Sequence, residues 1–126
     1  MIRTIISLCI IATTAGFAGA SQQRGIVFDK SAYVSYYADK FHGRKTASGE
    51  MFDQRKPTCA HRTLDFGTRV AFYNPVNKRT MVLKVNDRGP FHPDRLFDLP
   101  KGYFVYISHA GTTPGTLKLQ YKVLGK

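Results

Sequence analysis

The stretch around which this chain is organised is Val85-Asn86-Asp87-Arg88-Gly89-Pro90-Phe91. A β-rich segment, Thr80 to Val85, runs directly into it, and Gly89-Pro90 ends regular structure abruptly. The sequence therefore predicts that Asp87 lies at the end of a strand, beside Arg88 and a rigid turn. The same residue types also favour a plain turn for local backbone reasons, so the other motifs must decide between structure and chemistry.

The first twenty residues differ from the rest of the 126-residue chain. They combine the positive Arg3, an apolar run from Ile5 to Ala12 and the small-x-small pattern Ala18-Gly19-Ala20, which predicts a secretory signal peptide cut after Ala20. An uncleaved anchor is the alternative, but the apolar run is short for a membrane span of about 20 residues. Cys9 lacks the small-residue context of lipid attachment, so we expect no stable membrane anchor after cleavage.

We expect residues 21–126 to form one domain that is exported to the periplasm or secreted. The net charge is +11, and it falls to +10 without residues 1–20 because Arg3 is their only charged residue. Such a basic surface suggests anionic partners, although part of the charge can simply serve solubility. An exported protein meets cell-wall polymers rather than nucleic acid, so we expect a wall partner, no nucleic acid and a monomer.

Cysteine and histidine usage gives no sign of a disulfide, a metal or a cofactor. Cys59 stands alone after removal of the signal peptide, so no intramolecular disulfide can form. A packed Cys59 is favoured over a nucleophile acting with His61. The four histidines fit no zinc-type spacing, and neither a phosphate loop nor a Gly-x-Ser-x-Gly elbow is present.

The pattern of apolar residues predicts a mainly β chain. Residues 26–37 suit one or two strands, and residues 41–53 suit a long loop with a binding rim. Residues 68–85 alternate as a hairpin around a turn at 74–77, and residues 116–124 alternate as a terminal strand. Many short strands separated by Gly and Pro suggest a small barrel.

One short helix is predicted near the C-terminus. Asp98-Leu99-Pro100 can start a helix because proline is tolerated in the first turn. The helix would continue from Lys101 to Ser108, but the aromatic and β-branched residues of this segment suit a strand as well.

Several motifs resemble, in order and spacing, the rare lipoprotein A (RlpA) family of septal lytic transglycosylases. They are Phe41-His42-Gly43-Arg44-Lys45-Thr46-Ala47-Ser48-Gly49-Glu50, Ala60-His61-Arg62-Thr63-Leu64, Phe66-Gly67-Thr68-Arg69-Val70, the stretch at 85–91, Arg95 and Asp98-Leu99. The resemblance covers roughly residues 32–124. It implies a small six-stranded double-psi β-barrel with one or two short helices.

The resemblance also implies an activity. Family members cleave the β-1,4 bond between N-acetylmuramic acid (MurNAc) and N-acetylglucosamine (GlcNAc) in peptidoglycan without water, leaving 1,6-anhydro ends. It assigns the acid/base role to Asp87 and associates Glu50 and His61 with activity. We also expect substrate contacts from Tyr36, Tyr37, His42, Arg44 and Arg88.

These residue types suit glycoside chemistry. A departing glycosidic oxygen needs a proton, and an oxocarbenium-like centre needs stabilisation. A free aspartate has a pKa of about 3.9, so Asp87 needs burial or a nearby carboxylate such as Glu50 to hold a proton. His61 would orient Asp87 or move the proton, and Arg88 would point to substrate or backbone. Each residue also has a purely structural interpretation. Glu50 could be a loop carboxylate paired with Arg44, and His61 could be a packed residue that makes hydrogen bonds.

Two functions of other kinds remain open. A non-catalytic wall-binding or wall-loosening module, resembling the expansins that share this barrel, would use the same basic charge and aromatic residues. A hydrolase that uses water on a related glycan is the third possibility. Tyr36-Tyr37 stands where the family often has Trp-Tyr, and Pro100 stands where serine is usual.

Overall fold

The hairpin and the terminal strand form where the sequence alternates. They consist of β3 (Arg69–Asn74), β4 (Arg79–Asp87) and β6 (Leu117–Gly125). β3 and β4 are antiparallel, with Val70 opposite Leu83, and β6 pairs with the other side of β3. The predicted hairpin and terminal strand are therefore confirmed, and β4 continues beyond Val85 through Asp87.

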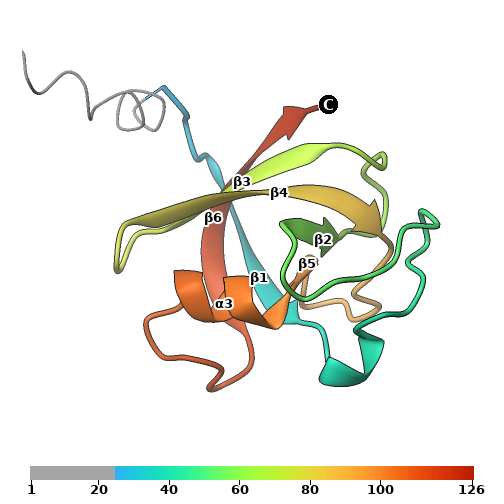
Figure 1. Cartoon of the computed structure of the whole chain (residues 1–126). Helices are drawn as coiled ribbons and strands as arrows, with labels where there is room; N and C mark the ends of the chain where they lie inside the picture. Colours follow the sequence, from blue (N-terminus) through green and yellow to red (C-terminus); the bar gives the residue numbers. More distant parts are fainter. Residues whose placement is uncertain (1–24) are drawn as a thin grey trace, which may run out of the picture.

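A computed structural model describes residues 25–126 and shows a closed six-stranded barrel (Figure 1). The remaining strands are β1 (Lys30–Tyr36), β2 (Thr58–Ala60) and β5 (Phe97–Leu99). Their order around the barrel is β1-β5-β2-β4-β3-β6, with β1–β5 and β2–β4 parallel. The mainly β prediction is confirmed, whereas the predicted signal peptide lies outside the described residues.

β5 occupies a position where the sequence predicted the start of a helix. That part of the prediction is wrong, because Phe97 and Leu99 are fully buried in the barrel while Asp98 faces away from it. Leu99 also precedes Pro100, which favours an extended backbone. Helix α3 (Lys101–Ile107) begins after Pro100, so the helix is confirmed from Lys101 onward and the strand alternative is wrong.

Every strand and α3 contribute side chains to the barrel core. Its largest fully buried side chains include Phe72, Phe97, Phe104, Leu83, Leu99 and Ile107. Phe97 meets the rings of Phe72 and Tyr121 edge-on, with centroids 5.0 and 5.2 Å apart. Burying a side chain of this kind contributes about 1.5–3 kcal/mol. Cys59 packs in the same core, as predicted, and burial raises the pKa of its thiol.

A second, smaller cluster lies on the outer side of β2 and consists of Tyr37, Phe52 and Ala60. The rings of Tyr37 and Phe52 are 4.0 Å apart. Phe52 lies near the end of the predicted 41–53 loop, and the first residue of that loop, Phe41, ends a 3-10 helix, η1 (Asp39–Phe41). Within the loop, Gly43 N–H donates to the Phe52 carbonyl at 2.8 Å and Phe52 N–H donates to the Arg44 carbonyl at 2.7 Å. The 41–53 loop is therefore held against the barrel rather than extended into solvent.

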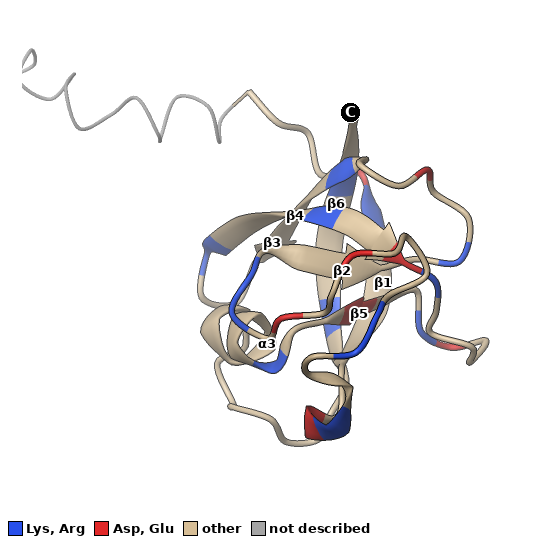
Figure 2. Cartoon of the chain, turned by 45° about the vertical axis from the view of Figure 1, so that its right-hand side comes forward, with Lys and Arg blue, Asp and Glu red and all other residues tan. Residues whose placement is uncertain are grey.

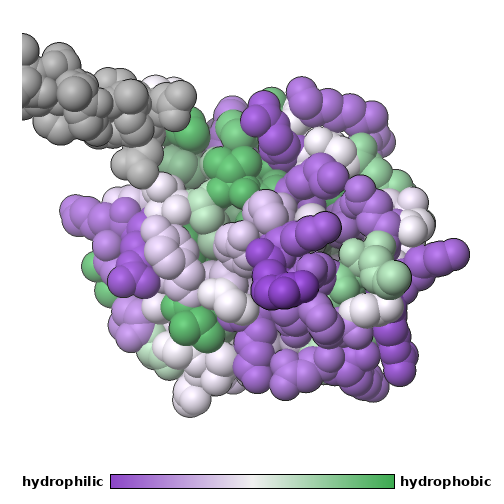
Figure 3. Space-filling view, viewed as in Figure 1, coloured by the Kyte–Doolittle hydropathy of each residue, from purple (hydrophilic) through white to green (hydrophobic). Residues whose placement is uncertain are grey.

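The surface is basic and mostly hydrophilic. Figure 2 shows Lys and Arg segments spread over strands and loops, while several of the few acidic segments lie near β2 and β5. Figure 3 shows hydrophilic residues over most of one face, with smaller hydrophobic areas between them. Among residues 25–126, no helix is long and apolar enough to cross a membrane.

Candidate active site

Asp87 is the last residue of β4, and its carboxylate accepts three hydrogen bonds. Oδ2 accepts one from the Tyr37 hydroxyl at 2.8 Å. Oδ1 accepts two, from the backbone N–H groups of Ala47 and Arg88, each at 2.9 Å. The donors come from the residue after β1, from the 41–53 loop and from the residue after β4. Three separate segments therefore fix the position of this carboxylate.

Strand register places a second carboxylate near Asp87. Ser35 on β1 pairs with Asp98 on β5, Asp98 pairs with Ala60 on β2, and Ala60 pairs with Asp87 on β4. A register shift between Cys59 and Ala60 brings Asp87, rather than its neighbour, opposite Ala60. Directly opposed residues lie on the same face of a sheet. Asp98 and Asp87 thus share a face two strands apart, with Cα atoms separated by roughly 10 Å.

Both aspartates line one groove, which encloses about 460 Å³. Its walls carry the aromatic residues Tyr36, Tyr37, Phe41 and Phe91. Phe91 is 84% exposed and Phe41 is 37% exposed, so their faces are open to a ligand. A groove with exposed aromatic surface and a few charged groups has the composition of a small-molecule or sugar site.

Asp98 lies deeper in the groove wall than a surface carboxylate. The Ser35 hydroxyl donates a hydrogen bond to its Oδ1. Its Oδ2 faces Gly89, where an added Cβ would lie 3.9 Å from that oxygen. The backbone of Gly89 has a φ of +128°, which residues with a side chain rarely adopt. Burial raises the pKa of Asp98, and the Asp87 carboxylate adds to this effect, while the Ser35 hydroxyl and Arg95 act in the opposite direction. Asp98 therefore keeps its proton to higher pH than an exposed aspartate does.

Tyr37 holds the Asp87 carboxylate in place through its hydroxyl group. The residue is only 7% exposed, and its ring packs on Phe52. Burial raises the pKa of its hydroxyl, and the hydrogen bond to the Asp87 carboxylate raises it further. The hydroxyl therefore stays protonated and donates to Asp87. The sequence predicted that Tyr37 binds substrate. The structure shows in addition that its hydroxyl bonds to the Asp87 carboxylate.

Arg88 points away from the carboxylate that precedes it. Its Nη1 donates to the carbonyls of Leu64 at 2.7 Å and His61 at 3.3 Å. The guanidinium also lies 4.0 Å from the centroid of the Phe66 ring. The expectation that Arg88 points to substrate or backbone is confirmed for the backbone, and the residue also lines the groove.

His61 meets Asp87 through the backbone. Its N–H donates to the Asp87 carbonyl at 3.1 Å, while its Nδ1 accepts from the N–H groups of Thr63 and Leu64 at 3.1 and 3.0 Å. The ring packs on Phe97 at 5.0 Å. Burial lowers the pKa of His61, and Arg62 and Arg88 lower it further. Within residues 25–126 the imidazole makes no hydrogen bond to the Asp87 carboxylate, so its role in proton movement stays a prediction.

Glu50 lies on the other side of the end of β4. Its Oε1 accepts a hydrogen bond from Asn86 Nδ2 at 3.1 Å, and its Oε2 lies 3.4 Å from Lys84 Nζ. The Asn86 bond lowers the pKa of Glu50, and Lys84 adds to the effect. The alternative pairing with Arg44 is wrong, because the partner is Lys84. Glu50 lines a separate hollow of about 380 Å³ that does not include Asp87.

The segment before Glu50 nevertheless reaches Asp87. Thr46 N–H donates to the Glu50 carbonyl at 2.7 Å, and Ser48 N–H donates to the Asn86 carbonyl at 3.2 Å. These bonds close a tight turn around Ala47, whose N–H is one of the donors to Asp87. Glu50 thus anchors the turn that supplies this donor.

The other two predicted substrate residues lie outside the groove. His42 Nδ1 accepts from Gln54 N–H at 3.1 Å, and His42 lines a hollow near η1. The exposed Arg44 places its guanidinium 5.8 Å from the centroid of Phe41, which does line the groove. The structure brings neither side chain to Asp87.

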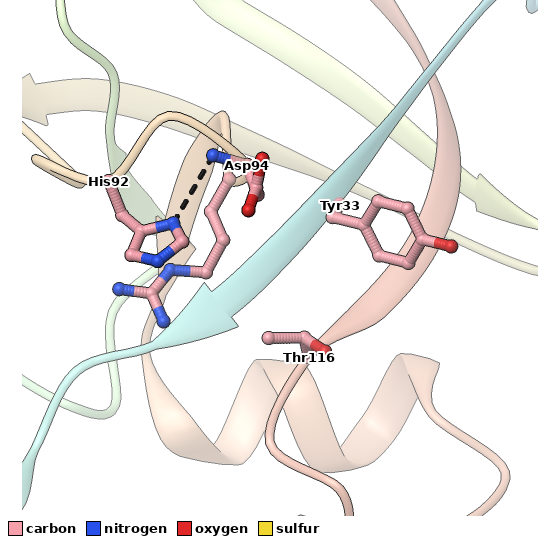
Figure 4. A pocket seen from close by; sticks show the side chains of 5 residues that line it. Tyr33, His92, Asp94 and Thr116 are labelled. Carbon is pink, nitrogen blue, oxygen red and sulfur yellow. Dashed lines mark hydrogen bonds between the residues drawn. The ribbon is translucent and has the colours of Figure 1, made fainter.

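A neighbouring hollow of about 580 Å³ shares Arg95 with the groove. Figure 4 shows Tyr33 and Thr116 on one side and His92 and Asp94 on the other, with Asp94 N–H donating to His92 Nδ1 at 3.2 Å. Tyr33 is 49% exposed. The two hollows are neighbours on the surface, with Arg95 between them.

Sequence reasoning missed the link between Ser35, Asp98 and Asp87. The sequence presented Asp98 as part of a possible helix start and of the Asp98-Leu99 motif, without a role in catalysis, and it gave no reason to single out Ser35. One local signal was present, since Asp98 separates two large apolar residues directly before Pro100, as an outward residue of a short strand does. Among residues 25–126, no group of His, Cys, Asp and Glu is arranged for a metal ion.

Comparison with known proteins defines the class of this chain. Residues 29–121 match the family described as "Lytic transglycolase". Because the match covers most of the chain and the strands form the expected six-stranded barrel, the chain belongs to this family and carries an RlpA-like double-psi β-barrel domain.

Individual relatives share the name RlpA. The chain is 48% identical over 83 residues to the "Probable endolytic peptidoglycan transglycosylase RlpA" of Treponema pallidum, a match that covers 66% of this chain and 26% of the relative. It is 51% identical over 73 residues to the protein of the same name from Synechocystis, which covers 58% of this chain and 23% of the relative. The "Endolytic peptidoglycan transglycosylase RlpA" of Neisseria meningitidis serogroup A is 34% identical over 99 residues, or 79% of this chain and 41% of the relative. The chain thus spans about a quarter of the first two relatives.

Proposed function

We propose that this protein is an exported lytic transglycosylase that cleaves the MurNAc-β-1,4-GlcNAc bond of peptidoglycan glycan strands. The observation that carries the proposal is Asp87, a carboxylate fixed by three donors and open to an aromatic groove. Membership of the lytic transglycosylase family supports it. The relatives are named as peptidoglycan transglycosylases, and this supports peptidoglycan as the substrate.

The reaction needs two proton transfers and no water. The bond between C1 of MurNAc and the glycosidic oxygen breaks, and the departing oxygen takes a proton from a carboxylic acid. The C6 hydroxyl of MurNAc forms a bond to C1 and gives its proton to a carboxylate, which leaves a 1,6-anhydro ring. Between these events the negative carboxylate stabilises the oxocarbenium-like centre. In the simplest scheme Asp87 performs both transfers, first as acid and then as base.

A polymer substrate fits the two neighbouring hollows. The hollow lined by Tyr33 and His92 continues from the groove through Arg95. A strand bound across Asp87 would therefore place further sugars on the exposed face of Tyr33. The basic surface suits a wall polymer that carries acidic groups. The predicted signal peptide, a periplasmic or secreted location and a monomeric state belong to the same proposal.

Mass spectrometry of purified glycan strands tests this proposal. After incubation with the protein, we expect products that end in 1,6-anhydroMurNAc. Reducing ends instead would indicate a hydrolase that uses water. Binding of the strands without new ends would indicate an expansin-like wall-binding module. Either result would overturn the proposed activity. Asp65→Asn is a suitable control, because Asp65 is an exposed acid outside the groove and should not affect turnover.

A further inference from the structure

We infer that Asp98 is a second catalytic carboxylate in this groove, which gives its proton to the departing glycosidic oxygen while Asp87 accepts the proton of the attacking hydroxyl. The inference rests on the proposed function and divides between two residues the roles that one carboxylate would otherwise hold. Neither the sequence motifs nor the resemblance assigned a role to Asp98.

Geometry is the first argument. Ser35, Asp98, Ala60 and Asp87 form one row across β1, β5, β2 and β4. The register pairs both aspartates with Ala60, one on each side of it, and both line the groove beside Tyr37. Their Cα atoms are roughly 10 Å apart, a span of two inter-strand spacings. A glycosidic bond held in this groove would therefore have a carboxyl group available on each side.

Hydrogen bonding is the second argument, because it gives Asp87 the character of an acceptor. Both partners of its Oδ1 are backbone N–H groups, which can only donate. The partner of Oδ2 is the Tyr37 hydroxyl, whose raised pKa keeps it protonated. Three of the roughly four acceptor positions of the carboxylate are therefore filled, and Oδ2 keeps one for a proton from the substrate, as a base requires.

Asp98 has the opposite surroundings. Within the described part of the chain, residues 25–126, Ser35 is the only side chain that donates a hydrogen bond to it, and the other oxygen faces Gly89 in the groove wall. The titratable and charged groups around it are Asp87 on β4, Tyr37 after β1, Cys59 on β2 and Arg95 before β5. Of these only Arg95 is a cation, and burial outweighs it, so the pKa of Asp98 is raised. A carboxyl group that keeps its proton can act as an acid.

The proton balance closes over one turnover. Asp98 loses a proton to the glycosidic oxygen, and Asp87 gains the proton of the C6 hydroxyl. The C1–oxygen bond breaks with its electron pair leaving on the glycosidic oxygen, and an electron pair of the C6 oxygen forms the new bond to C1. Transfer of one proton from Asp87 to Asp98, directly or through solvent, restores the starting state. No oxidant or other reactant is needed.

Asp98→Asn, assayed on two substrates, tests the division of roles. The first substrate is purified glycan, whose sugar alcohol leaving group needs protonation. The second is a disaccharide in which 4-nitrophenol replaces that leaving group and departs without a proton. We expect Asp98→Asn to lose about 10²–10⁴-fold on glycan and to stay within about tenfold of the original rate on the aryl glycoside. Asp87→Asn should lose activity on both.

Two results would overturn the inference. One is an Asp98→Asn variant that cleaves glycan at the original rate. The other is a folded variant, judged by its thermal unfolding midpoint, that loses activity equally on both substrates. If the unaltered protein forms no anhydro ends on glycan, then the proposed function fails, and that outcome is recognised before any variant is made.

Ser35→Ala provides a second test that leaves both carboxyl groups in place. The Ser35 hydroxyl lowers the pKa of Asp98, so its removal should raise that pKa. The alkaline limb of the pH profile of kcat/KM on glycan should then move to higher pH. The profile on the aryl glycoside should not shift, because its leaving group departs without a proton from Asp98. An alkaline limb that does not move on glycan would contradict an acid role for Asp98. A purely structural role of Ser35 would lower both profiles without shifting either one.

Discussion

The two sides of the end of β4 hold carboxylates in opposite conditions. On the groove side, Asp98 is enclosed, and burial raises its pKa. On the other side, Glu50 is half-exposed, and Asn86 and Lys84 lower its pKa. Asn86 and Asp87 are adjacent in the chain, yet Asn86 bonds to Glu50 and lines its hollow, whereas Asp87 lines the groove. Two neighbouring residues of β4 thus border one environment that raises the pKa of a carboxyl group and another that lowers it.

This difference separates two kinds of role. A carboxylate that must exchange a proton with substrate has to lie in the groove, and Asp87 and Asp98 do. A carboxylate that holds a loop in place functions best when ionised and paired with a cation, and Glu50 is paired in this way with Lys84. The backbone carbonyl of Glu50 closes the turn around Ala47, whose N–H binds Asp87, so we predict that Glu50 acts by holding this turn in place.

Asp87→Asn should have the largest effect, because it removes the proton acceptor from the groove side. We expect turnover of glycan to fall about 10³-fold. The amide keeps the shape of the carboxylate, so binding of the strands and the unfolding midpoint should change little. Release of anhydro ends measures the effect, with Asp65→Asn as the control that removes an exposed charge. Substantial turnover in Asp87→Asn would refute its role.

Tyr37→Phe should have the next largest effect. It removes the hydroxyl that donates to Asp87 Oδ2 and leaves the buried ring in place. We expect kcat to fall about tenfold, equivalent to about 1.4 kcal/mol, with a smaller change in KM. The matched control is Tyr73→Phe, since Tyr73 lies on β3, outside the groove. Equal kinetics for the two variants would show that the Tyr37 hydroxyl does not position the carboxylate.

Glu50 variants should have a smaller effect that depends on shape rather than charge. Glu50→Gln keeps an oxygen for Asn86, so we expect kcat to stay within about threefold, because a neutral hydrogen bond is worth about 1 kcal/mol. Glu50→Ala leaves Asn86 without this partner and should reduce kcat about fivefold. Faster amide exchange at Ala47 in the alanine variant would locate the change in the turn. A loss in Glu50→Gln as large as that in Asp87→Asn would give Glu50 a direct chemical role instead.

The pH dependence of stability at His61 should be the smallest effect. The folded pKa is lowered, so the unfolded chain binds the proton more readily than the folded chain does. The stabilisation is present above the ordinary histidine pKa of about 6.5 and is lost as the pH falls below it. We expect a loss of less than about 1 kcal/mol, because the ring is partly exposed. His61→Gln should flatten the unfolding free energy between pH 7.5 and 5.5 relative to the exposed-site control His109→Gln, and an unchanged slope would contradict this assignment.

The sequence predicted the elements that show a period and missed those too short to show one. The hairpin and the terminal strand follow from alternation over six to nine residues. β2 and β5 have only three residues each, so neither displays a repeat, and Pro100 made the end of β5 resemble a helix start. These two short strands place Ala60 and Asp98 in the row with Asp87.

The candidate site was predictable to a corresponding extent. The role of Asp87 could be predicted from its position before Gly89-Pro90 together with the resemblance. The partnership with Asp98 depends on which residues face each other across strands, and that register is a tertiary property. The orientation of Glu50 toward Lys84 likewise depends on how the 41–53 loop lies against the barrel.

The row of four residues has a consequence for when activity can arise. Ser35 and Asp98 are 63 positions apart in the chain, yet they are neighbours in the barrel. The groove therefore does not exist in any partly formed hairpin, and contacts of this range form late because they must close long loops. Closure of the barrel thus assembles the carboxylates of the groove, and the proposed activity requires the completely folded chain.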